Sequence, residues 1–159
     1  MYKFLSILAV LALEGCIMIV PVPLGTTTGT VEPKTVTIRP ATSGFGGALV
    51  AQRAANGVGP VEENATLTQV ANAYAQRQAR AGTLVHNADG MPWDRAQAAG
   101  YCSAFVGENL GNGLNSETEA LAAWMSSPGH RANILNPKFV RYGLGHFADT
   151  WVLMLGGAC

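Results

Sequence analysis

Residues 67–79 carry the clearest periodic pattern in this chain. Apolar or small side chains recur there at the spacing of one face of an α-helix, while amide and arginine side chains take the other face. The positions on the apolar face are Leu67, Val70, Ala71, Tyr74, Ala75 and Ala79. Gly82 follows and can end the helix, because glycine adopts left-handed backbone angles without strain. The pattern predicts an amphipathic helix that buries one face.

Weaker signals predict further helices and strands on both sides of this segment. Ser116 and Glu119 have the capping-box spacing of a helix start, and Pro128 cannot continue the helix that they begin. Because most helices precede an antiparallel pair of strands, a layered α+β domain fits this order better than a parallel βαβ sheet. Helices are expected at 48–55, 94–99 and 117–127, and strands at 103–106, 141–146 and 150–155.

The N-terminus has the features of a secretory signal. Lys3 precedes an apolar run over residues 4–13, which has the length and order of a cleaved signal rather than of a membrane span. The run ends in Leu-Glu-Gly-Cys at residues 13–16, which resembles a bacterial lipobox, so we expect Cys16 to carry lipid. Simple secretion and an uncleaved anchor are the alternatives, because residues 17–20 continue the apolar stretch.

These signals divide the chain into three parts. Residues 1–15 are the predicted signal peptide, residues 16–47 form a lipidated N-terminus and an extended tether rich in proline, threonine and glycine, and residues 48–159 form a folded domain. We therefore expect an exported protein of the periplasm or cell envelope that contacts the membrane through its lipid anchor. A protein that is simply secreted is the alternative.

The cysteine count and the net charge exclude a catalytic thiol and a nucleic-acid partner. If Cys16 is lipidated, Cys102 and Cys159 remain as one pair in an oxidising compartment, which predicts a disulfide and leaves no thiol for catalysis. The 159 residues include 10 lysines and arginines against 10 aspartates and glutamates, so the formal net charge is zero. No overall positive field exists to hold a phosphate backbone, and nucleic acid is not an expected partner.

Common motifs of hydrolases and nucleotide-binding proteins are absent. The sequence has no glycine-rich phosphate loop, no His-Glu-x-x-His pair and no Gly-x-Ser-x-Gly elbow. His86, Glu108 and His130 remain as candidates, each predicted in a turn or at the end of an element. Each also has a local interpretation: a solvated loop residue for His86, a carboxylate that fixes a turn for Glu108, and a cap at a helix end for His130.

Together, these residues lie in an ordered set of motifs. The set comprises Gly107-Glu108-Asn109-Leu110, a helix with Trp124, the segment from Ser127 to Leu135, Tyr142-Gly143-Leu144-Gly145, and Trp151. It resembles the bacterial branch of the CAP superfamily, also called SCP-like domains, which is named after cysteine-rich secretory proteins, antigen 5 and pathogenesis-related 1 proteins. The resemblance covers residues 48–151 and implies an α+β fold, a three-layer α/β/α sandwich with a central antiparallel sheet.

The resemblance also implies a cleft where two histidines and two glutamates meet, and which in some members binds zinc or another divalent cation. His86 and His130 match the histidines, Glu108 matches one glutamate, and Ser127 stands in the position of the other. A serine hydroxyl is a poor metal ligand at neutral pH, so we expect weaker zinc binding than a full tetrad would give. Without metal, we expect His86, Glu108 and His130 to converge as a charged cluster in which the carboxylate raises the histidine pKa.

Three functions are compatible with this sequence. The first is a non-enzymatic exported module that binds a lipid, glycan or protein ligand at the cell envelope, as the resemblance implies. The second is a hydrolase in which His86 or His130 acts as base and Glu108 orients it. The third is a purely structural envelope protein. A binding module needs an apolar groove beside the cleft, whereas an enzyme needs base, orienting partner and nucleophile together.

Overall fold

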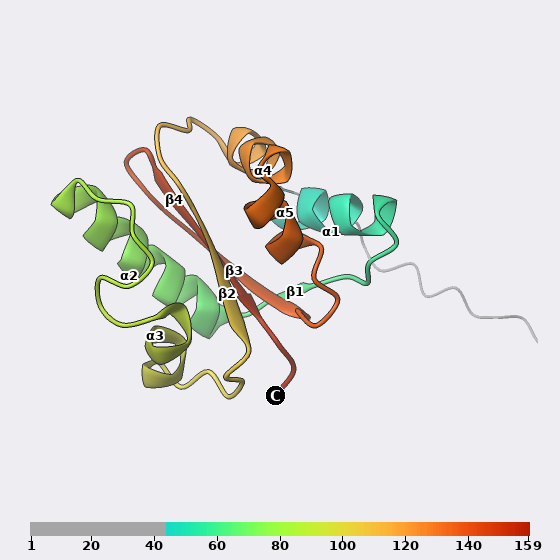
Figure 1. The fold of residues 1–159 in the computed structure, drawn as a ribbon, viewed down its shortest axis with the longest axis horizontal. Coiled ribbons are helices and arrows are strands. Elements are labelled where there is room, and N and C mark those ends of the chain that lie inside the picture. The colour runs from blue at the N-terminus through green and yellow to red at the C-terminus, as the bar shows by residue number, and fades with distance from the viewer. Residues whose placement is uncertain (1–43) are drawn as a thin grey trace, which may run out of the picture. The chain divides into compact units, whose positions relative to one another are not determined.

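The computed structural model describes residues 44–159, which contain one four-stranded sheet (Figure 1). The strands are β1 (Glu62–Glu63), β2 (Val106–Gly111), β3 (Arg141–Phe147) and β4 (Thr150–Gly156), in the order β1-β3-β4-β2. β2, β4 and β3 pair in antiparallel fashion, and only the short β1 runs parallel to its neighbour β3. The expectations for the signal peptide, for Cys16 and for the tether up to residue 43 lie outside the described residues.

Helices cover both faces of the sheet (Figure 1). One face carries α2 (Ala65–Ala81) and α3 (Pro92–Ala98), and the other carries α1 (Phe45–Ala55), α4 (Glu117–Ser126) and α5 (Pro128–Ile134). The predicted three-layer α/β/α sandwich is therefore confirmed. None of the helices within residues 44–159 has the length and apolar character that a membrane span requires.

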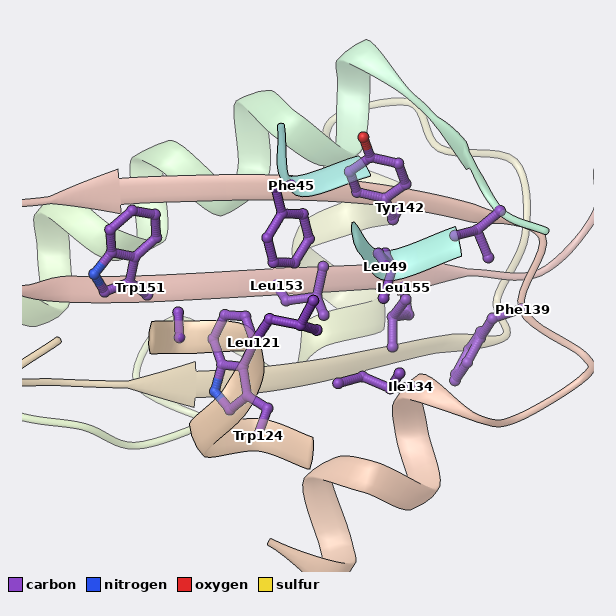
Figure 2. Packing of buried hydrophobic residues seen from close by; sticks show 12 residues of the cluster. Phe45, Leu49, Leu121, Trp124, Ile134, Phe139, Tyr142, Trp151, Leu153 and Leu155 are labelled. Atoms are coloured by element: carbon purple, nitrogen blue, oxygen red, sulfur yellow. The ribbon is translucent and has the colours of Figure 1, made fainter. Parts of the chain in front are cut away.

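β4 is buried along its whole length because a hydrophobic core packs on each of its faces. Successive side chains of a strand point to opposite faces. Leu153 and Leu155 accordingly join the core beneath α1, α4 and α5, together with Phe45 and Trp124 (Figure 2). Met154 joins the other core, beneath α2 and α3.

Glycine allows α2 to lie directly against β3. A Cβ atom at Gly143 would lie 2.2 Å from the backbone of Leu67, and one at Gly145 would lie 2.1 Å from the backbone of Ala71. Any larger residue at either position would push the helix off the strand. The amphipathic helix predicted at 67–79 is confirmed and ends at Gly82, which has the left-handed angles expected of a C-cap.

α1 begins three residues earlier than predicted, at Phe45, so assigning residues 45–47 to the tether was wrong. Phe45 is buried and contacts the ring of Trp124 edge to face. The backbone N–H of Phe45 donates to Oε2 of Glu117, 2.9 Å away. The N-cap residue Gly44 has no side chain to accept this bond, so a carboxylate distant in sequence caps the helix.

The strand expected at 103–106 was also misplaced. β2 runs from Val106 to Gly111, so Glu108 lies within a strand and does not fix a turn. Pro128 ends α4 as predicted but also starts α5, where it takes the first turn and needs no N–H partner. The two-residue β1 was not expected, because two glutamates carry no strand signal.

The predicted disulfide between Cys102 and Cys159 is confirmed. Their Cα atoms lie 5.3 Å apart, within the range that a disulfide spans. The bond joins the loop before β2 to the segment after β4. It therefore reinforces the pairing of these two strands at the end where β2 enters the sheet and β4 leaves it.

Arg53 connects α1 to the loops that lead into β1 and β3. Its side chain is buried, and its guanidinium donates four hydrogen bonds to backbone carbonyls. The acceptors are the carbonyls of Gly59, Ile134, Asn136 and Phe139. Burial lowers the pKa of Arg53, but arginine stays charged in proteins. One cation thus organises three segments of the chain.

Replacing Arg53 with methionine should destabilise the fold by about 3–4 kcal/mol, because buried carbonyls would lose a charged donor. Urea denaturation provides the measurement. Arg80→Met is the matched control, since Arg80 is exposed and makes a cation–π contact with Phe147, so its loss should cost less than about 1 kcal/mol. Equal effects of the two substitutions would contradict the role given to Arg53.

Candidate functional site

β2 is an outer strand of the sheet and presents polar side chains on both of its faces. Glu108 pairs with Met154 of β4 and Asn109 pairs with Leu153, and directly opposed residues in antiparallel strands share a face. Met154 belongs to the core beneath α2 and α3, whereas Leu153 belongs to the core on the other face. Glu108 therefore faces α3, and Asn109 faces α5.

Glu108 is a buried carboxylate with both oxygens hydrogen-bonded. Oε1 lies 2.8 Å from Nδ1 of His86, and Oε2 lies 2.5 Å from Nη2 of Arg95. Burial raises the pKa of the Glu108 carboxyl, and the charge of Arg95 and the hydrogen bond from His86 act against this rise. The predicted contact between His86 and Glu108 is present.

Arg95 is the member of this site that the sequence analysis missed. Its Nη1 donates to the backbone carbonyls of His86 and Gly90, and its guanidinium lies 3.5 Å from the centre of the Tyr74 ring. Arg95 therefore holds both Glu108 and the loop that carries His86. The short helix at 94–99 was predicted, but no motif identified its arginine as part of the site.

On the other face of β2, two asparagines connect the strand to α5. Asn109 Nδ2 donates to the backbone carbonyl of His130, at 3.0 Å. Asn133 Nδ2 donates to Oδ1 of Asn109 at 2.9 Å and to the carbonyl of Glu108 at 3.2 Å. From α4, Trp124 Nε1 donates to the carbonyl of Leu110. Side chains of α4 and α5 thus bind the outer edge of β2.

His130 differs from the sequence-based expectation in its pKa. The cluster was expected to raise the histidine pKa, but the pKa of His130 is lowered, first by burial and second by the neighbouring charge of His86. The charge that acts on His130 is that of His86, whose ring is hydrogen-bonded to Glu108. His130 therefore has a like charge as its electrostatic neighbour, which favours its neutral form.

Ser127 lies at the junction of α4 and α5 and is half-buried. Its backbone N–H donates to the carbonyl of Trp124, and its carbonyl accepts from the N–H of Arg131. These bonds end one helix and begin the next. A part for the Ser127 hydroxyl in ligand binding stays a prediction.

The family resemblance raises zinc or another divalent cation as a ligand of this site. Both oxygens of Glu108 already accept a hydrogen bond, Oε1 from His86 and Oε2 from the guanidinium of Arg95, so a cation bound to this carboxylate would compete with Arg95. Within residues 44–159, no three histidine, cysteine, aspartate or glutamate side chains are grouped to hold a metal ion. Arg95 already supplies positive charge beside Glu108, which disfavours a cation bound to that carboxylate.

A groove lies beside this cluster, between α2 and α3. It has a volume of about 350 Å³ and is lined largely by apolar and small side chains. Arg95 lines the groove and also binds Glu108, so the groove and the His86–Glu108 pair share one residue. The principal lining residues are Val70, Ala73, Tyr74, Arg95, Ala98 and Ala99, with Gln69 and Asp89 completing the wall.

Sequence comparison gives a family match over most of the folded region. The model of the cysteine-rich secretory protein family, CAP, matches residues 47–150. The uncharacterized protein YkwD of Bacillus subtilis (strain 168) is 35% identical over 98 residues, which is 60% of this chain. The match spans only 38% of the length of that Bacillus protein.

Three of the solved structures that share the fold are bacterial proteins. An extracellular protein of Bacillus anthracis that contains an SCP domain superposes with a TM-score of 0.69 at 21% identity, over 72% of this chain and 39% of that one. An outer surface protein of Borrelia burgdorferi superposes with a TM-score of 0.66 at 22% identity, over 70% of this chain and 88% of that one. A cysteine-rich secretory protein of Staphylococcus aureus superposes with a TM-score of 0.63 at 18% identity, over 72% of this chain and 37% of that one. At these identities the likeness establishes the fold alone.

The pKa of His130 provides a direct test of the site's electrostatics. Proton NMR titration should place it below the usual value of about 6.5, because burial and His86 both disfavour the charged form. In His86→Gln the pKa of His130 should rise, since the like charge is removed. A folded-state pKa that is lowered makes stability fall as pH drops from about 6.5 through the pKa of His130. A His130 pKa above 6.5 would contradict this assignment.

Arg95→Gln should bind zinc about tenfold more tightly than the unmodified protein, because it removes a cation and frees Oε2 of Glu108. Calorimetric titration of the purified protein with zinc measures the difference. Arg77→Gln is the matched control, because Arg77 pairs with Asp89 rather than with Glu108. Equal zinc affinities in all three proteins would show that Arg95 does not oppose a metal.

Proposed function

Because the chain belongs to the cysteine-rich secretory protein family, we propose that it is an exported, non-enzymatic domain that binds a ligand at the cell envelope. The proposal has two parts, the location of the protein and the task of its site. Each part is supported by different residues and can be tested separately.

Three observations support export. Disulfides such as that between Cys102 and Cys159 persist in oxidising compartments, so its formation favours a location outside the cytoplasm. The apolar run over residues 4–13 has the length of a secretory signal, and the cysteine that follows is suited to lipidation. Among the proteins that share the fold, one is described as extracellular and another as an outer surface protein.

The groove between α2 and α3 is the observation that carries the binding proposal. Ligand sites are usually concave, largely apolar and supplied with a few polar groups. This groove fits that description, and it adjoins the His86–Glu108 pair through Arg95. Glu108 accepts hydrogen bonds from His86 and Arg95. This arrangement suits a carboxylate that fixes the positions of these two side chains.

The hydrogen bond between His86 and Glu108 favours hydrolysis as a second candidate function. An ionised carboxylate can only accept, so it holds the imidazole proton on Nδ1 and leaves Nε2 free to act as a base. Half of the His86 side chain is exposed, so water can reach it. However, no hydroxyl group described in residues 44–159 is hydrogen-bonded to His86, and Cys102 and Cys159 are joined to each other. A hydrolase here would need water as nucleophile.

We expect protein made in its own host to fractionate with membranes, to begin at Cys16 and to carry acyl chains, because several buried chains anchor a protein durably. Cys16→Ser should move it to the soluble exported fraction. Cys159→Ser is the matched control, since it removes a cysteine without touching the anchor and should leave membrane association intact. Mass spectrometry of the intact protein detects the acyl chains, and under native conditions it also detects a retained ligand.

Two results would overturn this proposal. Unchanged membrane association of Cys16→Ser would exclude lipidation as the anchor. Efficient turnover of p-nitrophenyl esters that disappears in His86→Ala would favour the hydrolase over the binding domain. Equal, slow ester hydrolysis by both proteins is the expected outcome.

A further inference from the structure

We propose that the open edge of β3 at Leu144 binds a short extended segment of another polypeptide, which adds to the sheet as a further strand and carries a lysine or arginine near its C-terminal end. β3 and β2 lie on opposite sides of β4 in the sheet, so this surface is distinct from the His86–Glu108 pair. The inference therefore goes beyond the proposed function and does not depend on it. It is carried by unpaired backbone groups, by a hollow beside them and by the charge of Glu63.

Only the first residues of β3 have a neighbouring strand on the side away from β4 (Figure 1). The N–H of Asn64 donates to the carbonyl of Tyr142, 2.8 Å away, so this carbonyl points toward β1. Because alternate residues of a strand present their backbone groups to the same edge, the N–H and C=O of Leu144 point the same way. The chain turns into α2 at Ala65, and among residues 44–159 no group pairs with the backbone of Leu144 on this side. Such an edge is a template for an added strand.

A hollow of about 500 Å³ lies beside this open edge. It is bounded by Glu63, which pairs with Tyr142, and by Asn72, whose Oδ1 accepts from the N–H of His146. Leu144 lies between Tyr142 and His146 in β3, so the hollow follows the unpaired part of the edge. Its remaining lining comes from α2, namely Ala65, Thr68 and Gln69. The hollow provides room for side chains of an added strand.

The two ends of the open edge limit the length of the bound segment. β1 occupies the edge as far as Tyr142, and β3 ends at Phe147. Because a strand rises about 3.3 Å per residue, the space between these limits holds about four or five residues. A second copy of β3, paired in antiparallel fashion about Leu144, would push its C-terminal end into β1. The edge therefore suits a short segment of another polypeptide better than a second copy of this chain.

The charges at this edge favour a cationic side chain at one end of the segment. The exposed carboxylate of Glu63 accepts a hydrogen bond from Oγ1 of Thr68, and no lysine or arginine lines the hollow. The nearby Arg141 is paired with Glu62. Antiparallel pairing, which is the more stable arrangement, brings the C-terminal end of the segment beside Glu63. A lysine or arginine there would form an ion pair with this carboxylate.

The probe for strand addition is the peptide Thr-Val-Thr-Val-Thr-Lys, acetylated and amidated at its ends. It is titrated into the isotope-labelled full chain while NMR follows the backbone amides. We expect saturable shifts at Leu144 and His146 and slower hydrogen exchange of the Leu144 N–H. The same peptide with N-methyl groups on its two central residues blocks both of its edges and should bind at least about tenfold more weakly, because main-chain hydrogen bonds supply the affinity. Equal binding of the two peptides would overturn strand addition.

The charge assignment is tested with Glu63→Gln. This variant should bind the lysine peptide about two- to fivefold more weakly, as expected for the loss of one exposed ion pair. Asp89→Asn is the matched control, because it removes the same charge from the loop after α2, where Asp89 pairs with Arg77. Equal affinities of Glu63→Gln and the unmodified protein would overturn the assignment of a cationic residue.

Ala65→Trp tests the location. Ala65 is exposed, so tryptophan there should fill the hollow without disturbing the core and weaken peptide binding at least about tenfold. Ala54→Trp is the matched control, because Ala54 is exposed on α1, on the other face of the sheet. Undiminished binding to Ala65→Trp would place the peptide elsewhere and overturn the proposal.

Light scattering of the protein without peptide tests the choice of occupant. We expect a monomer over the concentrations used for NMR. A dimer that forms with rising concentration and is lost in Ala65→Trp would identify a second copy of the chain as the occupant, and the proposal of a different polypeptide would be wrong.

Discussion

The double burial of β4 is the constraint on which the rest of this fold depends. Alternate side chains such as Leu153 and Met154 enter separate cores, so neither face of the strand can carry an unpaired charge. β3 and β2 take their register from this strand, and Gly143 and Gly145 then let α2 lie against β3. The position of Glu108 follows, because its strand is fixed to β4 residue by residue.

The elements that the sequence predicted well are those specified by nearby residues. The helix at 67–79 and its stop at Gly82, the cap formed by Ser116, and the final pair of strands all depend on local periodicity or turn chemistry. The start of α1 depends instead on Glu117, which is distant in sequence, and the extent of β2 depends on pairing with β4. Local sequence patterns indicate neither the contact with Glu117 nor the pairing with β4.

The site divides in the same way. The family resemblance predicted that His86 and Glu108 would meet, and they do. It did not identify Arg95, because an ion pair between a short helix and a strand leaves no periodic signal. The expected direction of the histidine pKa was wrong for His130, because neither its burial nor the nearness of His86 can be read from spacing alone. Both burial and the charge of His86 favour the neutral form of His130.

The hydrogen bonds along the outer edge of β2 affect how readily this protein aggregates. An open strand edge offers unpaired carbonyls to other chains and is a common starting point for aggregation. Here Asn133 occupies the carbonyl of Glu108, and Trp124 occupies that of Leu110. A foreign strand would have to displace both side chains, one of them from a hydrophobic core. The contacts that hold α4 and α5 against β2 therefore also disfavour edge-to-edge association between copies of the protein.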